Sequence, residues 1–186
     1  MSNLLRTLMF GGIDGIITIF NIMSGIEGSR LNYKYIFIIG AATLVSDAIS
    51  MGTGEYLSVK AENELKKKTS ENNSNSNSEN NSNSENNSDG DASPEKKGIV
   101  MFISFILFGM IPLILYFLML KINFKNRYVN AYVSVITALF ILGVYKSRYT
   151  KEKWYKSGIY IAGYGAVAGF LAFHISRGIS NLQYLF

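Results

Sequence analysis

Residues 98–120 read GIVMFISFILFGMIPLILYFLML, an apolar run close to the roughly 20 residues that a helix needs to cross a bilayer. Four further apolar runs occupy about residues 4–26, 35–59, 128–146 and 156–176. Short basic connections separate most of them. The sequence therefore predicts an all-α membrane protein with five transmembrane helices in one membrane domain.

One long connection interrupts this pattern with an extremely polar composition. Its centre, TSENNSNSNSENNSNSENNSDGDASPE at residues 69–95, is low in complexity and contains too little apolar surface to fold. We expect residues 1–60 to form the first two transmembrane helices, residues 61–97 a disordered cytosolic loop, and residues 98–186 the last three transmembrane helices.

The basic residues indicate topology. A formal net charge of +5 would suggest nucleic acid as a partner of a soluble protein, but here Lys and Arg lie at the ends of the apolar runs. Twice as many of them lie on the side of the N-terminus as on the other side. The positive-inside rule then places the N-terminus in the cytosol and the C-terminus in the lumen, and it leaves no role for nucleic acid.

The chain has no cysteine and one histidine, His174. Disulfides, thiolate metal sites and cysteine nucleophiles are therefore excluded, and a zinc site of the usual Cys-rich or His-rich kind is not expected. We interpret His174 as a packing or interfacial residue. Carboxylates and methionines are left as the main candidate metal ligands.

Two aspartates lie inside apolar spans, Asp14 in the first and Asp47 in the second. A charged side chain at mid-bilayer costs about 2.5 to 3.5 kcal/mol even on the mildest insertion scale. Neither aspartate has a Lys or Arg within a helical turn, and the last three spans contain no internal basic residue. Protonation, water or a bound cation is left to stabilise them.

Helical spacing gathers these aspartates with other polar side chains into two stripes. One face of the first span carries Asp14, Thr18, Asn21 and Gly25. The second span carries, at intervals of four residues, Thr43, Asp47, Met51 and Glu55. Glu62 lies farther along toward the cytosol. Because carboxylates bind divalent cations and a thioether favours softer transition ions, the stripes predict a path for cations or protons.

Small residues recur at GxxxG spacing in two spans. The first contains Gly11 and Gly15, and the fifth contains Gly165 and Gly169. Such faces let helices approach closely in lipid, so we expect both pairs to lie at helix contacts.

The polar motifs carry a family resemblance. DGIITIF at residues 14–20 and AISMGTGEYLS at residues 48–58, followed by Lys60-Ala61-Glu62, resemble the vacuolar iron transporter family. The likeness continues in order through the last three spans. The chain is similar to a short form of that family, because the Asn/Ser tract stands where plant-type members carry a Glu-rich cytosolic metal-binding domain.

The resemblance implies a homodimer of five-helix subunits, surrounded by membrane lipid, that moves ferrous iron, Fe(II), and often manganese, Mn(II), out of the cytosol in exchange for protons. The metal is then a transported substrate, and no cofactor is implied. The destination is an intracellular compartment, vacuole-like or endoplasmic reticulum. Asp14 and Met51 correspond to the residues that line the family's path at the dimer interface, and Glu55 and Glu62 correspond to acidic residues at its cytosolic end.

The chain departs from the family at Thr43, where many members carry a glutamate. Our hypothesis is that Asp47, one helical turn farther along, supplies the missing carboxylate. Two alternatives to transport stay open at this stage, a non-transporting membrane scaffold of the same fold and an intramembrane aspartyl hydrolase. A hydrolase would need Asp14 and Asp47 about 3 Å apart and flanking motifs that the sequence lacks, so we do not expect an enzyme.

Overall fold

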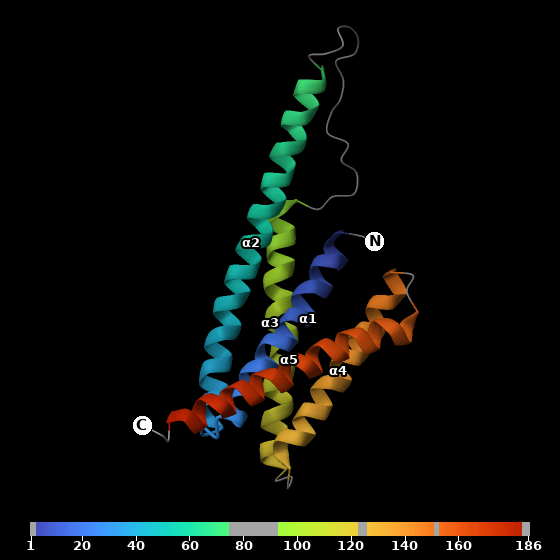
Figure 1. Ribbon diagram of the computed structural model, residues 1–186. Coiled ribbons are helices and arrows are strands. Elements are labelled where there is room, and N and C mark those ends of the chain that lie inside the picture. The colour runs from blue at the N-terminus through green and yellow to red at the C-terminus, as the bar shows by residue number, and fades with distance from the viewer. Residues whose placement is uncertain (1–2, 75–92, 123–125, 151–152, 184–186) are drawn as a thin grey trace.

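A computed structural model describes residues 3–74, 93–122, 126–150 and 153–183. The elements within these ranges are the helices α1 (Asn3–Gly28), α2 (Lys34–Ser74), α3 (Pro94–Lys121), α4 (Arg127–Thr150) and α5 (Trp154–Gln183), which form one bundle (Figure 1). Each contains a stretch long and apolar enough to cross a membrane. The prediction of an all-α protein with five such helices is confirmed.

The hydrophobic core lies around α1, which contacts all four other helices. Apolar side chains recur at helical spacing along α1. They pack against α3 on one side and against the α4–α5 hairpin on the other. The bulkiest fully buried members of this core are Ile16, Phe20, Met23, Ile36, Tyr116, Val135 and Leu139. Because α1 lies at this core, its polar side chains most need hydrogen-bonding or ionic partners within the protein.

Glycines bring helix backbones into direct contact at two crossings. A Cβ added to Gly15 of α1 would lie 2.5 Å from the carbonyl oxygen of Phe105 and 3.2 Å from the backbone nitrogen of Gly109, both in α3. A Cβ added to Gly98 of α3 would lie 2.8 Å from the carbonyl oxygen of Gly52 in α2. No larger residue fits such a contact, so these glycines set the spacing of α1, α2 and α3.

Both GxxxG pairs lie at helix contacts, as predicted. Gly11 and Gly15 lie against α3, Gly165 lies against α4, and Gly169 lies against α1. The two pairs therefore act in different places: one fixes the α1–α3 crossing, and the other lets α5 approach both α4 and α1.

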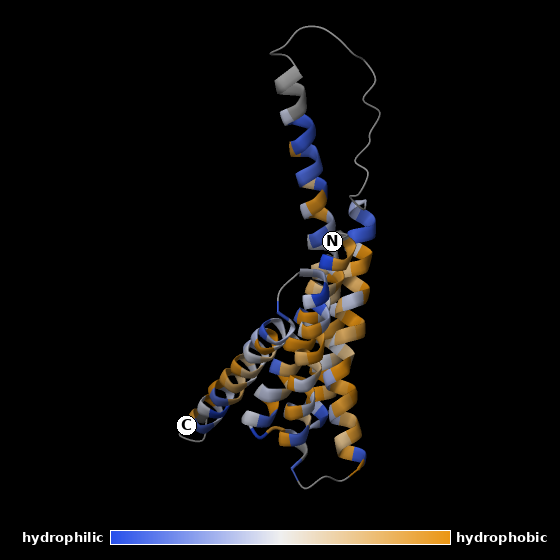
Figure 2. Ribbon diagram, turned by 90° about the vertical axis from the view of Figure 1, so that its right-hand side faces the viewer, coloured by the Kyte–Doolittle hydropathy of each residue, from blue (hydrophilic) through white to orange (hydrophobic). Residues whose placement is uncertain are grey.

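α2 continues well beyond its apolar part as a polar extension (Figure 2). Residues 60–68, KAENELKKK, are good helix formers, and Glu62 forms a salt bridge of 2.8 Å with Lys66 one turn later. The prediction of a disordered loop from residue 61 onward is therefore wrong for residues 61–74, where helix propensity outweighs the polar composition.

The other end of the predicted loop is also helical. Pro94 begins α3, where its missing N–H costs nothing, and the N–H of Lys97 donates to the carbonyl oxygen of Ser93 at 3.1 Å. The loop prediction is thus wrong for residues 94–97 as well. Its remainder, residues 75–92, lies outside the described residues.

α1 ends in a hydrogen-bonded cap slightly beyond the predicted end at residue 26. The N–H of Leu31 donates to the carbonyl oxygen of Ile26 at 3.3 Å, and the N–H of Arg30 donates to that of Glu27 at 3.2 Å. Arg30 adopts the left-handed conformation, with φ of 58°, that such caps require. Glu27 is therefore part of the last turn of α1.

Candidate metal-binding pathway

The predicted stripe on α1 is accessible at Asp14 and covered at its far end. Asp14, Thr18 and Asn21 are half-buried. Oδ1 of Asn21 is buried and has no hydrogen-bond partner within the described part of the chain. Gly25 lies against Ser176 of α5. Near the end of α1, α5 therefore covers this stripe.

The predicted stripe on α2 lies along the edge of the contact that α2 makes with the rest of the chain. Its four residues are all half-buried: Thr43, Asp47, Met51 and Glu55. On one side of them α2 turns the buried Leu44 and Ala48 toward the core, and on the other side it turns Ser50 and Gly54 outward. The stripe can therefore be reached from outside the single chain, at the boundary between α1 and α2.

Asp14 and Asp47 interact electrostatically across the contact between α1 and α2. The negative charge of Asp47 acts on Asp14, and both side chains are half-buried. Two carboxylates in this relation favour a bound cation, because a divalent ion neutralises both at once. The two aspartates thus lie on two helices that pack against each other.

Met51 lies one helical turn from Asp47 and packs against a small apolar cluster. The buried members of this cluster are Ile19, Leu44, Ala48 and Phe105. Met51 itself is half-buried, so this packing restrains a flexible thioether without covering it completely. Met51 is therefore placed to contribute a soft ligand beside Asp47.

Glu55 connects α2 to α1 through a side chain that sequence analysis missed. Oγ1 of Thr7 donates a hydrogen bond of 3.0 Å to Oε1 of Glu55. Thr7 is buried, with 4% of its surface exposed. The signal was available in the sequence, because Thr7 lies seven residues before Asp14 and so on the same face of α1.

Glu62 lies apart from this group. It is on the polar extension of α2, where its side chain is 57% exposed and bonded to Lys66. The structure therefore brings Asp14, Asp47, Met51 and Glu55 to the α1–α2 contact and leaves Glu62 outside it.

A second carboxylate that sequence analysis missed is Glu27, in the last turn of α1. The hydroxyl of Tyr116 in α3 donates a hydrogen bond to Oε1 of Glu27, and Glu27, Asn126 and Tyr128 line a cavity of about 270 Å³. Glu27 follows Asp14 by thirteen residues, which places it on the opposite face of the helix. It does not belong to the stripe of Asp14.

The described residues of one chain supply an incomplete set of metal ligands. Among them, no three His, Asp or Glu side chains lie close enough together to hold a metal ion. His174 is exposed on α5, where its ring packs against those of Phe170 and Phe173 at 4.1 and 5.4 Å between centroids. A metal at the stripes thus needs ligands besides those that the described residues of one chain supply, or water.

Comparison with known proteins agrees with the sequence motifs. The model of the VIT family matches residues 5–88 and 77–177. The protein named "Vacuolar iron transporter" from Plasmodium falciparum (isolate 3D7) is 31% identical over 95% of this chain and 82% of its own length. The protein of the same name from Plasmodium berghei (strain Anka) is 30% identical, over 91% and 80%.

A plant relative is more distant but covers as much of the chain. "Vacuolar iron transporter homolog 2.1" from Arabidopsis thaliana is 25% identical over 95% of this chain and 82% of its own length. The family model and the Plasmodium relatives span all five helices, including both stripes. This chain belongs to the VIT family.

Proposed function

We propose that this protein is a multi-pass transporter that moves ferrous iron, or manganese, from the cytosol into a vacuole-like intracellular compartment. The observation that carries this proposal is the pair of half-buried aspartates, Asp14 on α1 and Asp47 on α2 one turn from Met51, on packed helices apolar enough to span a membrane. The relatives named as vacuolar iron transporters support iron as the substrate.

The chemistry of the stripes supports divalent transition ions. The two aspartates supply negative charge, and the thioether of Met51 favours these ions over magnesium and calcium. The cation moves past Glu55, which Thr7 holds against α1, then past Met51 to the two aspartates. Glu62, on the extension, precedes Glu55 on this route.

Proton exchange follows from the same carboxylates. A divalent cation that arrives between Asp14 and Asp47 displaces protons from them, and protons that return from an acidic lumen displace the cation. The transporter is therefore a proton antiporter. In this scheme the N-terminus and the extension of α2 face the cytosol, as the distribution of basic residues predicts.

A homodimer completes the ligand set. α2 exposes a column of small residues next to the stripe: Ala42, Ser46, Ser50 and Gly54. Nothing lies within 4 Å of a Cβ added to Gly54. A column of small side chains on a membrane helix permits close approach of a second helix. A second copy at this face would add its own Asp14, Asp47 and Met51 to the site.

Single-cysteine variants test the dimer directly, because the chain has no native cysteine. We expect Ser50→Cys and Gly54→Cys each to form a disulfide-linked dimer when membranes are treated with copper phenanthroline, since a disulfide needs Cβ atoms only about 4 Å apart. Non-reducing electrophoresis measures the product. Ile141→Cys, which is exposed on α4, is the control. Equal cross-linking of all three variants, or none of Ser50→Cys and Gly54→Cys, would contradict this interface.

Uptake into proteoliposomes tests the transport itself. We expect Fe(II) or Mn(II) to accumulate when the lumen is more acidic than the outside, and Ca(II) to be excluded, because the site combines carboxylates with a thioether. Zn(II) completes the comparison. The scaffold alternative predicts no uptake above that of protein-free liposomes. It also predicts no rescue of an iron-sensitive strain that lacks its vacuolar transporter.

The Thr7–Glu55 hydrogen bond gives a sharper prediction about the route. Thr7→Val keeps the volume but removes the donor, and a hydrogen bond to a charged group contributes about 1.5 kcal/mol, so we expect the metal concentration for half-maximal uptake to rise about tenfold. Thr7→Ser keeps the donor and should behave as the unmodified protein. If the Val and Ser variants have the same concentration dependence, the hydroxyl plays no part in positioning Glu55.

A further inference from the structure

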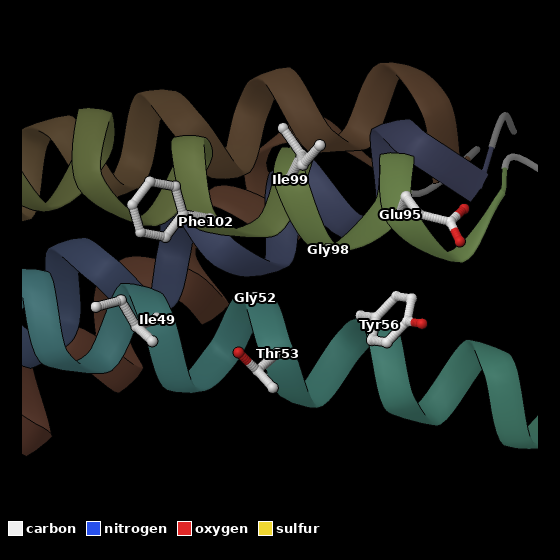
Figure 3. A pocket seen from close by; sticks show the side chains of 8 residues that line it. All are labelled: Ile49, Gly52, Thr53, Tyr56, Glu95, Gly98, Ile99 and Phe102. Carbon is white, nitrogen blue, oxygen red and sulfur yellow. The ribbon is translucent and has the colours of Figure 1, made fainter.

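A groove runs along the outer side of the contact between α2 and α3 (Figure 3). It encloses a cavity of about 350 Å³, and its side-chain lining includes Ile49, Thr53, Tyr56, Glu95, Ile99 and Phe102. Tyr56 follows Asp47 by nine residues, which is half a turn around α2. The groove therefore lies on the side of α2 away from the proposed metal pathway.

Two glycines create the groove. Gly52 and Gly98 belong to its lining, and there the backbones of α2 and α3 touch. The floor of the groove consequently has no side chains, whereas Ile49 and Phe102 flank it farther along (Figure 3). From Ile49 to Tyr56 the groove follows α2 for about 10 Å, given the rise of a helix. This shape suits a single extended hydrocarbon chain.

The groove changes from apolar to polar along its length. Figure 3 shows Ile49 and Phe102 at one end, with the hydroxyl of Tyr56 and the carboxylate of Glu95 at the other. The polar end adjoins the start of the hydrophilic extension of α2 (Figure 2), which is where a membrane-spanning helix passes into the headgroup region. The groove is therefore oriented as a lipid is, with hydrocarbon deep and polar groups at the surface.

Charges of both signs lie near the polar end, where Glu95 lines the groove and the buried Lys97 directly precedes Gly98. Nζ of Lys60 lies 6.0 Å from the centroid of the Tyr56 ring, one turn beyond it on α2, and Glu95 stands on α3. Neither Lys60 nor Glu95 takes part in a salt bridge within the described residues. Each charge is thus available to a ligand that brings both a negative and a positive group.

We propose that this groove binds a phosphatidylethanolamine. One acyl chain lies along Ile49, Ile99 and Phe102, the phosphate meets Lys60, and the ammonium donates hydrogen bonds to Glu95. A phosphatidylglycerol has no cation for Glu95, and a phosphatidylcholine has a cation without N–H donors. The charge pattern therefore selects the ethanolamine headgroup over both.

Native mass spectrometry of the purified protein in mild detergent tests this binding without any transport assay. The protein is mixed with equal amounts of phosphatidylethanolamine, phosphatidylcholine and phosphatidylglycerol that carry the same acyl chains. We expect one phosphatidylethanolamine per chain, in about tenfold excess over phosphatidylglycerol, as one charge-assisted contact of about 1.4 kcal/mol provides. Equal adducts of the three lipids would show only a nonspecific lipid annulus and overturn the proposal.

Two kinds of variant locate the lipid. Ile99→Trp fills the groove and should abolish the adduct, whereas Ile103→Trp, on the exposed side of α3 outside the groove, should leave it unchanged. Glu95→Gln alters only an exposed residue and should reduce the phosphatidylethanolamine preference to parity, which keeps the test decisive if Ile99→Trp fails to fold. An adduct that survives both changes would place the lipid elsewhere. A lipid-free dimer that dissociates in Ile99→Trp would show that a second copy covers the groove.

Discussion

Asp47→Ala should abolish ferrous uptake, with a fall of at least about 100-fold, because changes around a metal site already cost 10- to 100-fold when they remove only a supporting group. Asp47 is half-buried and interacts with Asp14 across the α1–α2 contact. Thr43→Ala, one turn earlier on the same stripe, should retain most of the activity. The measurement is the initial rate of Fe(II) uptake into proteoliposomes under a fixed pH gradient.

Two further variants separate a ligand from a merely structural residue. Asp14→Ala should match the loss in Asp47→Ala, because one carboxylate alone cannot neutralise the cation. Glu27→Gln removes a carboxylate from the opposite face of the same helix and should retain uptake. Equal, mild effects of Asp47→Ala and Thr43→Ala would contradict our assignment of Asp47. Uptake that survives the combination of Asp14→Ala and Met51→Ala would show that the site lies elsewhere.

Gly15→Ala should produce the largest loss of stability. The added Cβ would lie 2.5 Å from the carbonyl oxygen of Phe105, a backbone atom that cannot rotate away. Overpacking of this kind costs about 3 kcal/mol, which lowers the unfolding temperature of a chain of this size by about 10 °C. Size-exclusion chromatography of detergent-purified protein after heating measures the change.

Gly163→Ala is the matched control for this prediction. Nothing lies within 4 Å of a Cβ added at Gly163, and alanine favours a helix over glycine. We therefore expect Gly163→Ala to unfold at the original temperature or slightly above it. If Gly15→Ala and Gly163→Ala unfold at the same temperature, the α1–α3 crossing does not depend on the glycine contact.

The five helices could be predicted because membrane burial demands long, uninterrupted apolar runs, and this chain has five of them. The ends of α2 and α3 could not be predicted on the same basis. Composition assigned residues 61–74 to the polar tract, although their Glu, Lys, Ala and Leu residues favour a helix and Glu62 pairs with Lys66. Hydropathy reports where a helix is buried and says little about where it ends in water.

Much of the candidate site could be predicted as well, because helical periodicity is strict and a carboxylate in lipid is costly. This reasoning found Asp14, Asp47, Met51 and Glu55. It did not select Thr7, because a threonine in a membrane helix indicates no function until its hydrogen bond to Glu55 is known. It also could not show that the charge of Asp47 acts on Asp14, because periodicity fixes the face of each helix but not how two helices are rotated against one another.

The extension of α2 also provides a way to read the orientation of each reconstituted molecule. It carries the exposed Lys67 and Lys68 past the apolar part of the bundle, near a helix end, where local opening is easiest (Figure 2). Trypsin added outside sealed vesicles should cut the extension only in those molecules whose extension points outward. The fraction cut within the extension, recognised by the size of the fragments, then measures how many molecules face each way, so an uptake rate can be assigned to one direction of transport.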